Sequence, residues 1–314
     1  MSKRALGIGL VLLVVACALP FVLSNYRTFQ MTLVLVYAIA LLGLNILTGY
    51  NGQISLGHGA FYALGAYCTA ILMDRWGVPY WATIPVAGAV CLVAGFVFGL
   101  PALRLEGLYL ALATFALGVA TPQLLKYHLL EKWTGGVQGI VIMKPSPPFG
   151  LPLNPDQWLY FFTLAIAAGM FILAYNLIRG RIGRALVAIR DQHIAAEAMG
   201  INNALYKSLA FGVSAMFTGV AGALGAVAVQ FVAPDSFNIF LSITLLVGIV
   251  VGGLASISGA LYGAIFIQFV PNLADEISKA APWAIFGVFM IGFVYLMPTG
   301  VAGAVRLIKR RRAA

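Results

Sequence analysis

Polar side chains able to handle a solute gather in one stretch between two apolar runs. Residues 44–60 contain four glycines together with amides, hydroxyls and one histidine. Amide and hydroxyl groups exchange hydrogen bonds with a polar solute without carrying charge, so this stretch is a candidate lining for a path across a membrane. The candidate pathway residues are Asn45, Asn51, Gln53, Ser55, His58 and Tyr62.

Two conformations of this stretch fit the sequence. One is a broken helix that faces the pathway, because irregular backbone at membrane depth is tolerated only where protein buries it or where it lines a watery cavity. The other, which the glycines favour, is a tight turn at the cytoplasmic side, with Gly57, Gly59 and Gly65 allowing close helix packing. His58 on its own indicates a packed, hydrogen-bonded side chain rather than a ligand or proton carrier.

A second interruption, rich in glycine and serine, occupies residues 252–260 and adds Ser256 and Ser258 to the pathway candidates. It lies at a comparable place in the second half of the chain. Paired interruptions of this kind predict a two-half repeat with interrupted helices and a path between the halves.

The remaining residue types give no sign of catalysis. His58, His128 and His193 are far apart and lack a metal-binding spacing such as HExxH. The phosphate-binding pattern GxxxxGK followed by Ser or Thr is also missing from the sequence. We therefore expect no catalytic centre, metal or cofactor, and any energy for active transport has to come from another polypeptide.

Residues 183–200 form a third polar group. Their sequence is compatible with a helix that stops at Gly200. At 100° per residue, Arg190, His193 and Glu197 fall within an arc of about 60°. A helix here would carry one polar stripe, which either docks onto a soluble partner or is an ordinary solvated face.

The elements that position these groups belong to a membrane protein. Of the 314 residues, 62% are hydrophobic and 9% are charged, whereas a soluble domain carries about 25% charge. Uncharged runs of about 18 residues span the hydrocarbon as helices. The sequence therefore predicts an all-α polytopic membrane protein with about ten transmembrane helices. The expected spans are 6–24, 31–48, 60–73, 79–103, 107–125, 157–178, 208–232, 238–252, 259–271 and 283–305.

The charges predict how these spans are oriented. With the N-terminus inside, one face receives thirteen Lys or Arg and three Asp or Glu, and the other face receives six of each. The net charge of +10 then lies on the cytoplasmic face, as the positive-inside rule expects. Both termini are predicted to be cytoplasmic, and the basic composition needs no nucleic acid to explain it.

No Asp, Glu, Lys or Arg is expected in mid-span, although such groups usually mark proton relays and charged-ion paths. This pattern argues against proton coupling. It favours a path for a zwitterion or a small neutral molecule.

Four segments together resemble a known family: 43–67, 104–111, 134–140 and 183–222. In this order they resemble the permease subunits of bacterial branched-chain amino-acid ABC importers of the M-type (LivM-like), over about residues 31–303. Ala196, Glu197 and Ala198, followed by Gly200, are similar to the Glu-Ala-Ala coupling loop of binding-protein-dependent importers. The resemblance implies an ATPase-coupling site made of Arg190, His193, Ala196, Glu197, Ala198 and Gly200.

The resemblance also implies an organisation and a set of partners. Residues 1–314 would form a single permease domain in the bacterial inner membrane, with a periplasmic loop at 126–156 and a cytoplasmic coupling loop at 179–207. An H-type permease, two cytoplasmic ATPases and a periplasmic binding protein would complete an importer for Leu, Ile or Val. Urea or short amides are the alternative substrates, and a passive channel or facilitator is the alternative of a different class.

Overall fold

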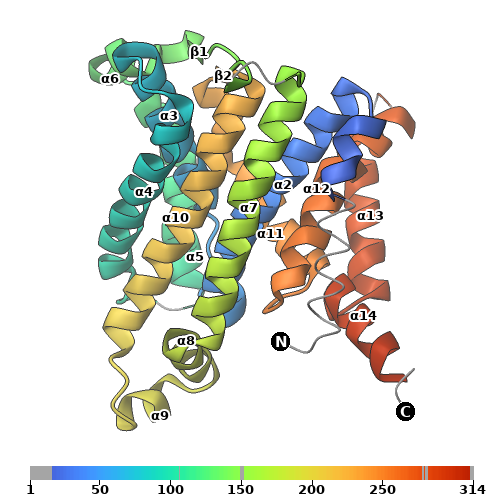
Figure 1. Ribbon diagram of the computed structural model, residues 1–314. Coiled ribbons are helices and arrows are strands. Elements are labelled where there is room, and N and C mark those ends of the chain that lie inside the picture. The colour runs from blue at the N-terminus through green and yellow to red at the C-terminus, as the bar shows by residue number, and fades with distance from the viewer. Residues whose placement is uncertain (1–15, 106, 149–151, 278, 280–281, 312–314) are drawn as a thin grey trace.

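The computed structural model describes residues 16–105, 107–148, 152–277, 279 and 282–311. Within this part almost all of the chain is helical, and seven helices are long and apolar enough to cross a membrane. The long helices run between two faces. One face carries a short sheet, β1 with β2, and the opposite face carries the two short helices α8 and α9 (Figure 1). The predicted all-α polytopic fold is confirmed.

The helices have the following bounds: α2 Asn25–Asn45, α3 His58–Trp76, α4 Tyr80–Ala102, α5 Leu108–Leu125, α6 His128–Thr134, α7 Pro155–Arg179, α8 Arg181–Asp191, α9 His193–Ala198, α10 Asn203–Val229, α11 Ile239–Gly252, α12 Ile257–Ile277, α13 Pro282–Leu296 and α14 Gly300–Arg311. A π-helical turn, Ile46–Tyr50, continues α2, and 3₁₀ turns occupy Gly136–Gln138 and Pro234–Phe237.

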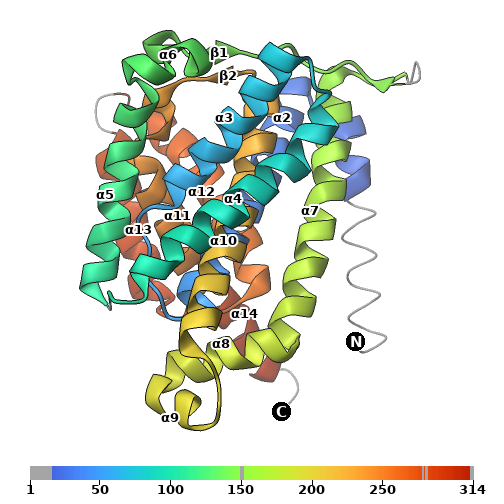
Figure 2. The ribbon, with the colours of Figure 1, turned by 90° about the vertical axis from the view of Figure 1, so that its left-hand side faces the viewer.

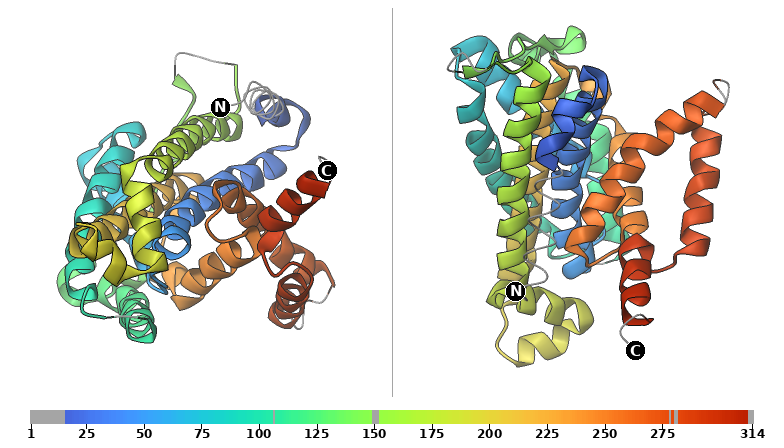
Figure 3. Two further views of the ribbon diagram at one scale, coloured as in Figure 1. Left: turned by 90° about the horizontal axis from the view of Figure 1, so that it is seen from below. Right: turned by 45° about the vertical axis from the view of Figure 1, so that its right-hand side comes forward.

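Helix α10 lies at the centre of the bundle and packs against α2, α3 and α4 (Figure 2). Glycines permit this close approach, because a β-carbon on Gly65 of α3 would overlap the backbone carbonyl of Gly219 in α10. Gly57 and Gly59 are crowded in the same way by Thr114 and Ser242. The expected packing role of these three glycines is confirmed. Helices α12, α13 and α14 form a group to one side, with α12 resting on α2 (Figure 3).

The segment 126–156 is an ordered connection and not a further long apolar helix, as far as its described residues go. It contains α6 and β1 (Ile140–Val141), which pairs antiparallel with β2 (Phe231–Val232) so that Ile140 lies opposite Val232. Lys126 also forms an ion pair with Asp235. These contacts attach the connection to the end of α10.

One expected span is only partly described, and another differs from the structure. Of 6–24, residues 6–15 lie outside the described part, and residues 16–22 are helical. The expected span 283–305 is wrong as one helix, because α13 ends at Leu296 and α14 starts at Gly300. Pro298 has no N–H to continue the helix, and Gly300 takes a left-handed φ of 70°. The break lets α14 approach the interruption at Gly253.

The single helix expected over 183–200 is also wrong. It divides at Gln192, whose φ of −159° and ψ of 98° are extended, into α8 and α9. Leu186 and Ile189 of α8 and Ala196 of α9 are all buried. A turn between the two helices brings both apolar faces against the protein. The predicted stop is confirmed, since α9 is followed by Gly200 at a φ of 83°.

Candidate functional site: interrupted helices and a coupling loop

The stretch between α2 and α3 is not a tight turn. After the π-helical turn Ile46–Tyr50, residues 51–57 form no helix or strand until α3 begins at His58. His58 contacts Ser214, which lies about 16 Å along α10 from the first residue of that helix. The segment therefore enters the bundle. Most of its polar groups find partners there, although the buried Asn51 Oδ1 has none among the described residues.

Side chains from neighbouring helices satisfy this irregular backbone. Thr114 Oγ1 of α5 accepts from the Leu56 N–H at 3.0 Å, and Ser242 Oγ of α11 accepts from the Gly59 N–H at 2.9 Å. Within the segment, Thr48 donates to the Gln53 carbonyl and Asn51 Nδ2 donates to Gln53 Oε1. Unsatisfied backbone groups are costly in an apolar medium, so these contacts hold the segment in one conformation.

His58 is the centre of a buried polar chain. Its Nε2 lies 2.6 Å from Ser214 Oγ and its Nδ1 lies 2.9 Å from Ser55 Oγ. Ser214 donates its proton to the Gly43 carbonyl, so its oxygen accepts from the histidine, which assigns the ring proton to Nε2. Ser55, His58 and Ser214 are fully buried. This arrangement links α2, α3 and α10 and leaves both ring nitrogens of His58 occupied.

Asn45 joins the two interruptions that the sequence places in separate halves. Its Nδ2 donates to the Ser256 carbonyl at 2.8 Å, and its Oδ1 accepts from the Ala255 N–H at 2.9 Å. Ala255 has an unusual positive φ of 52°, and a β-carbon on Gly49 would collide with its backbone. The last residue of α2 thus clamps the connection between α11 and α12.

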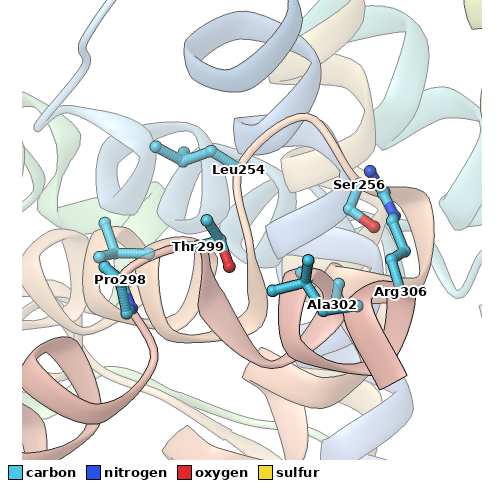
Figure 4. Close-up of a pocket in the computed structure, with 9 residues that line it drawn as sticks. Leu254, Ser256, Pro298, Thr299, Ala302 and Arg306 are labelled. Atoms are coloured by element: carbon cyan, nitrogen blue, oxygen red, sulfur yellow. The ribbon is translucent and has the colours of Figure 1, made fainter. Parts of the chain in front are cut away.

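Two cavities near this clamp are lined by the pathway candidates of the second interruption, Ser256 and Ser258. The first has a volume of about 460 Å³ and lies between residues 250–256 and α14, with Ser256 beside Arg306 (Figure 4). The second has a volume of about 530 Å³ and is lined by Ser256, Ser258, Tyr50 and Arg306, among others. Among the described residues that line these two cavities, none is one of the other six pathway candidates. Those six side chains are all buried in the bundle.

The coupling-loop candidates lie on the opposite face from β1 and β2 but do not form one stripe (Figure 2). Glu197 and the His193 carbonyl both accept from Asn203 Nδ2, at 3.3 and 2.9 Å, which attaches α9 to the start of α10. Arg190 belongs to α8, and its NH1 donates to the Gly49 carbonyl at 2.9 Å. Ala198 is exposed, whereas Ala196 packs inward.

Several residues of the two sites were not predicted from the sequence. Thr114, Ser214 and Ser242 each lie inside a long apolar run, and Ile194 and Met199 are apolar side chains exposed on the coupling loop at 66% and 83%. A lone Ser or Thr in an apolar run is a weak signal. Its position gives no information about which helix face it occupies or which backbone it meets.

These features define an all-α, multi-pass membrane protein whose buried polar groups hold two helix interruptions together. The family described as "Branched-chain amino acid transport system / permease component" matches residues 26–298, and this chain belongs to that family. It is a family of transport permeases, not of enzymes.

Among curated relatives, the chain is 33% identical to the high-affinity branched-chain amino acid transport system permease protein LivM of Escherichia coli, over 90% of this chain and 72% of the relative. It is 23% identical to the permease protein LivH of Salmonella typhimurium, over 85% of this chain and 91% of the relative. It is 25% identical to the autoinducer 2 import system permease protein LsrC of Salmonella typhimurium, over 68% and 61%. No solved structure matches the chain.

Proposed function

We propose that this chain is the membrane-spanning permease subunit of an ABC importer that moves branched-chain amino acids delivered by a periplasmic binding protein. The observation that carries the proposal is the 33% identity to LivM over 90% of the chain. The mid-span regions without charged residues agree with a path for zwitterions, and the family is one of transport permeases. An H-type permease, two ATPases and the binding protein are the proposed partners.

The proposed orientation places the α8–α9 face in the cytoplasm of a bacterial cell and the β1–β2 face in the periplasm. Arg179, Arg181, Arg184 and Arg190 belong to the α8–α9 face, which agrees with the positive-inside rule. Seven long helices together with α3 and α13 give nine crossings of the inner membrane. The expected span 6–24, of which residues 6–15 lie outside the described part, would be the tenth, and ten crossings place both termini in the cytoplasm.

We assign ATPase docking to α9. Ile194 and Met199 expose apolar surface outside the long apolar helices, and a soluble partner can bury such surface. His193, Ala198 and Glu197 surround it with exposed polar and small side chains. Gly200 ends the helix, and Asn203 holds α9 against α10.

For the pathway we propose the side of the bundle that contains Ser256 and Ser258, because both residues line cavities. The buried groups Asn45, Asn51, Gln53, Ser55, His58 and Tyr62 then have a supporting role. They hold the interrupted helices whose ends form the cavity wall.

The proposed function predicts uptake that depends on ATP. The chain, reconstituted with its partner permease, ATPases and binding protein in proteoliposomes, should accumulate labelled leucine when ATP is supplied and should not respond to an imposed pH gradient. Labelled urea and acetamide test the alternative substrates in the same vesicles. Accumulation of leucine by the permease pair alone, driven by the pH gradient, would contradict the importer assignment.

The docking assignment predicts that Glu197→Lys and Gly200→Val both weaken ATPase binding. Lysine reverses a charge at the partner-facing helix and loses the contact with Asn203, and valine fits a φ of 83° poorly. We expect ATPase co-purification to fall at least about tenfold, which corresponds to about 1.4 kcal/mol. Glu131→Lys, with the same charge change on the opposite face, is the control and should keep wild-type co-purification. Unchanged co-purification in both loop variants would indicate a merely solvated face.

A further inference from the structure

Arg190 lies on the coupling loop and its side chain is 34% exposed, yet its guanidinium reaches the interrupted end of α2. Its NH1 donates to the carbonyl of Gly49, a residue 141 positions away in the chain. Its Nε and NH2 both donate to Asp191 Oδ1, at 3.0 and 2.9 Å. The planar guanidinium is therefore held between a carboxylate of its own helix and a carbonyl of the interrupted α2, an arrangement that requires several donors in a fixed fork.

Gly52 makes room for this contact. A β-carbon on Gly52 would lie 2.8 Å from Arg190 Cγ, so the aliphatic stem of the arginine rests directly on the glycine backbone. Gly52 also has a φ of 78°. Both ends of the Arg190 side chain thus meet the same short stretch of chain, residues 49–52.

The carbonyl that Arg190 binds belongs to a π-helical turn, Ile46–Tyr50. Single π-turns are rare and are frequently found at functional sites. Gly49 packs against Ala255, and Asn45, just before the turn, holds Ala255 and the Ser256 carbonyl. A displacement at Gly49 therefore acts directly on the segment that lines the cavities.

Two neighbouring charged residues of α8 and α9 make shorter-range contacts in the described part of the chain. Arg184 NH1 donates to the Arg179 carbonyl, at the other end of the same loop. Glu197 binds Asn203, five residues from the end of α9. Arg184 accordingly offers a matched control: the same residue type on the same helix, without a contact to an interrupted helix.

We propose that Arg190 is a positioning residue that transmits the movement of α8 and α9 to the π-helical turn of α2, and through Asn45 to the connection between α11 and α12. The proposal rests on the proposed function, in which the ATPases move the coupling loop. The π-turn is the element with two arrangements, and the Arg190–Gly49 hydrogen bond favours the one seen here. Arg190 therefore couples ATP hydrolysis to transport without itself docking the ATPase.

The test uses the complete transporter in proteoliposomes with the variants Arg190→Met and Arg184→Met. Methionine keeps an unbranched stem over Gly52 and removes every donor. For Arg190→Met we expect retained ATPase co-purification and retained basal ATP hydrolysis, with leucine transported per ATP reduced at least about fivefold. Arg184→Met should keep the wild-type ratio. Arg190→Lys, which keeps a single cationic donor group without the fork, should give an intermediate ratio of leucine to ATP. If Arg190→Met does not insert, Arg190→Lys is compared with Arg184→Met in its place.

Peptide-resolved hydrogen exchange separates transmission from a general loss of structure. In the wild type, ATP binding should change exchange in both 181–200 and 46–56; in Arg190→Met the change should persist in 181–200 and disappear in 46–56. Equal ATP-induced changes in both segments of Arg190→Met, or an unchanged transport ratio, would overturn the proposal. Failure of the wild-type chain to bind ATPases at all would instead overturn the proposed function.

Discussion

Gly65→Val should prevent the bundle from folding normally, because no space exists for a side chain where α3 crosses α10. A β-carbon at this position would already overlap the Gly219 carbonyl, which is backbone and cannot rotate away. Overpacking of a close-packed interior typically costs about 1–3 kcal/mol, and a branched side chain against backbone belongs at or above that range. We expect a loss of more than about 3 kcal/mol in the free energy of unfolding.

The measurement is the yield of monodisperse protein and its thermal unfolding in detergent. Gly169→Val is the control, since a β-carbon on Gly169 of α7 would meet nothing within 4 Å. Its cost should remain below about 1 kcal/mol, the scale of helix propensity differences. If the two variants unfold at the same temperature, the contact between α3 and α10 is not the close packing described here.

Asn45→Ala should give the second large effect. The substitution removes both hydrogen bonds that join α2 to the connection between α11 and α12. The Ala255 N–H loses this acceptor, whereas the Ser256 carbonyl still accepts from the Gly259 N–H. Each buried polar group left unsatisfied costs about 1–3 kcal/mol. We expect the free energy of unfolding to fall by about 1.5–4.5 kcal/mol, of which the Ala255 N–H accounts for about 1–3 and the lost bond to Ser256 for about 0.5–1.5.

Asn272→Ala provides the comparison for Asn45. Asn272 is exposed on α12, and its side chain donates to the Gln268 carbonyl of the same helix. Its loss should change the free energy of unfolding by less than about 0.5 kcal/mol, as for most surface substitutions. A melting temperature of Asn45→Ala within error of Asn272→Ala would show that the clamp between the two halves contributes nothing to stability.

Much of the architecture was predictable because a membrane helix is marked in the sequence by a long uncharged run of apolar residues. Long uncharged runs predicted α4, α5, α7 and α10 within a few residues, and Gly200 was correctly identified as a helix stop. The joint signal of four ordered segments identified the family. These inferences depend on composition and short-range pattern, which a single sequence displays directly.

The errors occurred where local pattern and packing disagree. Residues 183–200 have a continuous helical pattern, yet burial of Leu186, Ile189 and Ala196 requires a turn at Gln192. Residues 44–60 have the composition of a surface turn, yet Thr114 and Ser242 allow their backbone to enter the bundle. In both cases partners distant in sequence outweigh local preference.

The sequence by itself determined the membrane setting, the helical class and the family, because these properties belong to segments and sum along the chain. Only the tertiary structure decided that Asn45 meets Ser256, that His58 bonds Ser214 and that the guanidinium of Arg190 donates to the Gly49 carbonyl. The physical reason is that a hydrogen bond between residues 141 to 211 positions apart depends on how helices cross. Crossing geometry is set by backbone contacts at glycines such as Gly65 and Gly219, whose partners are not marked in the sequence.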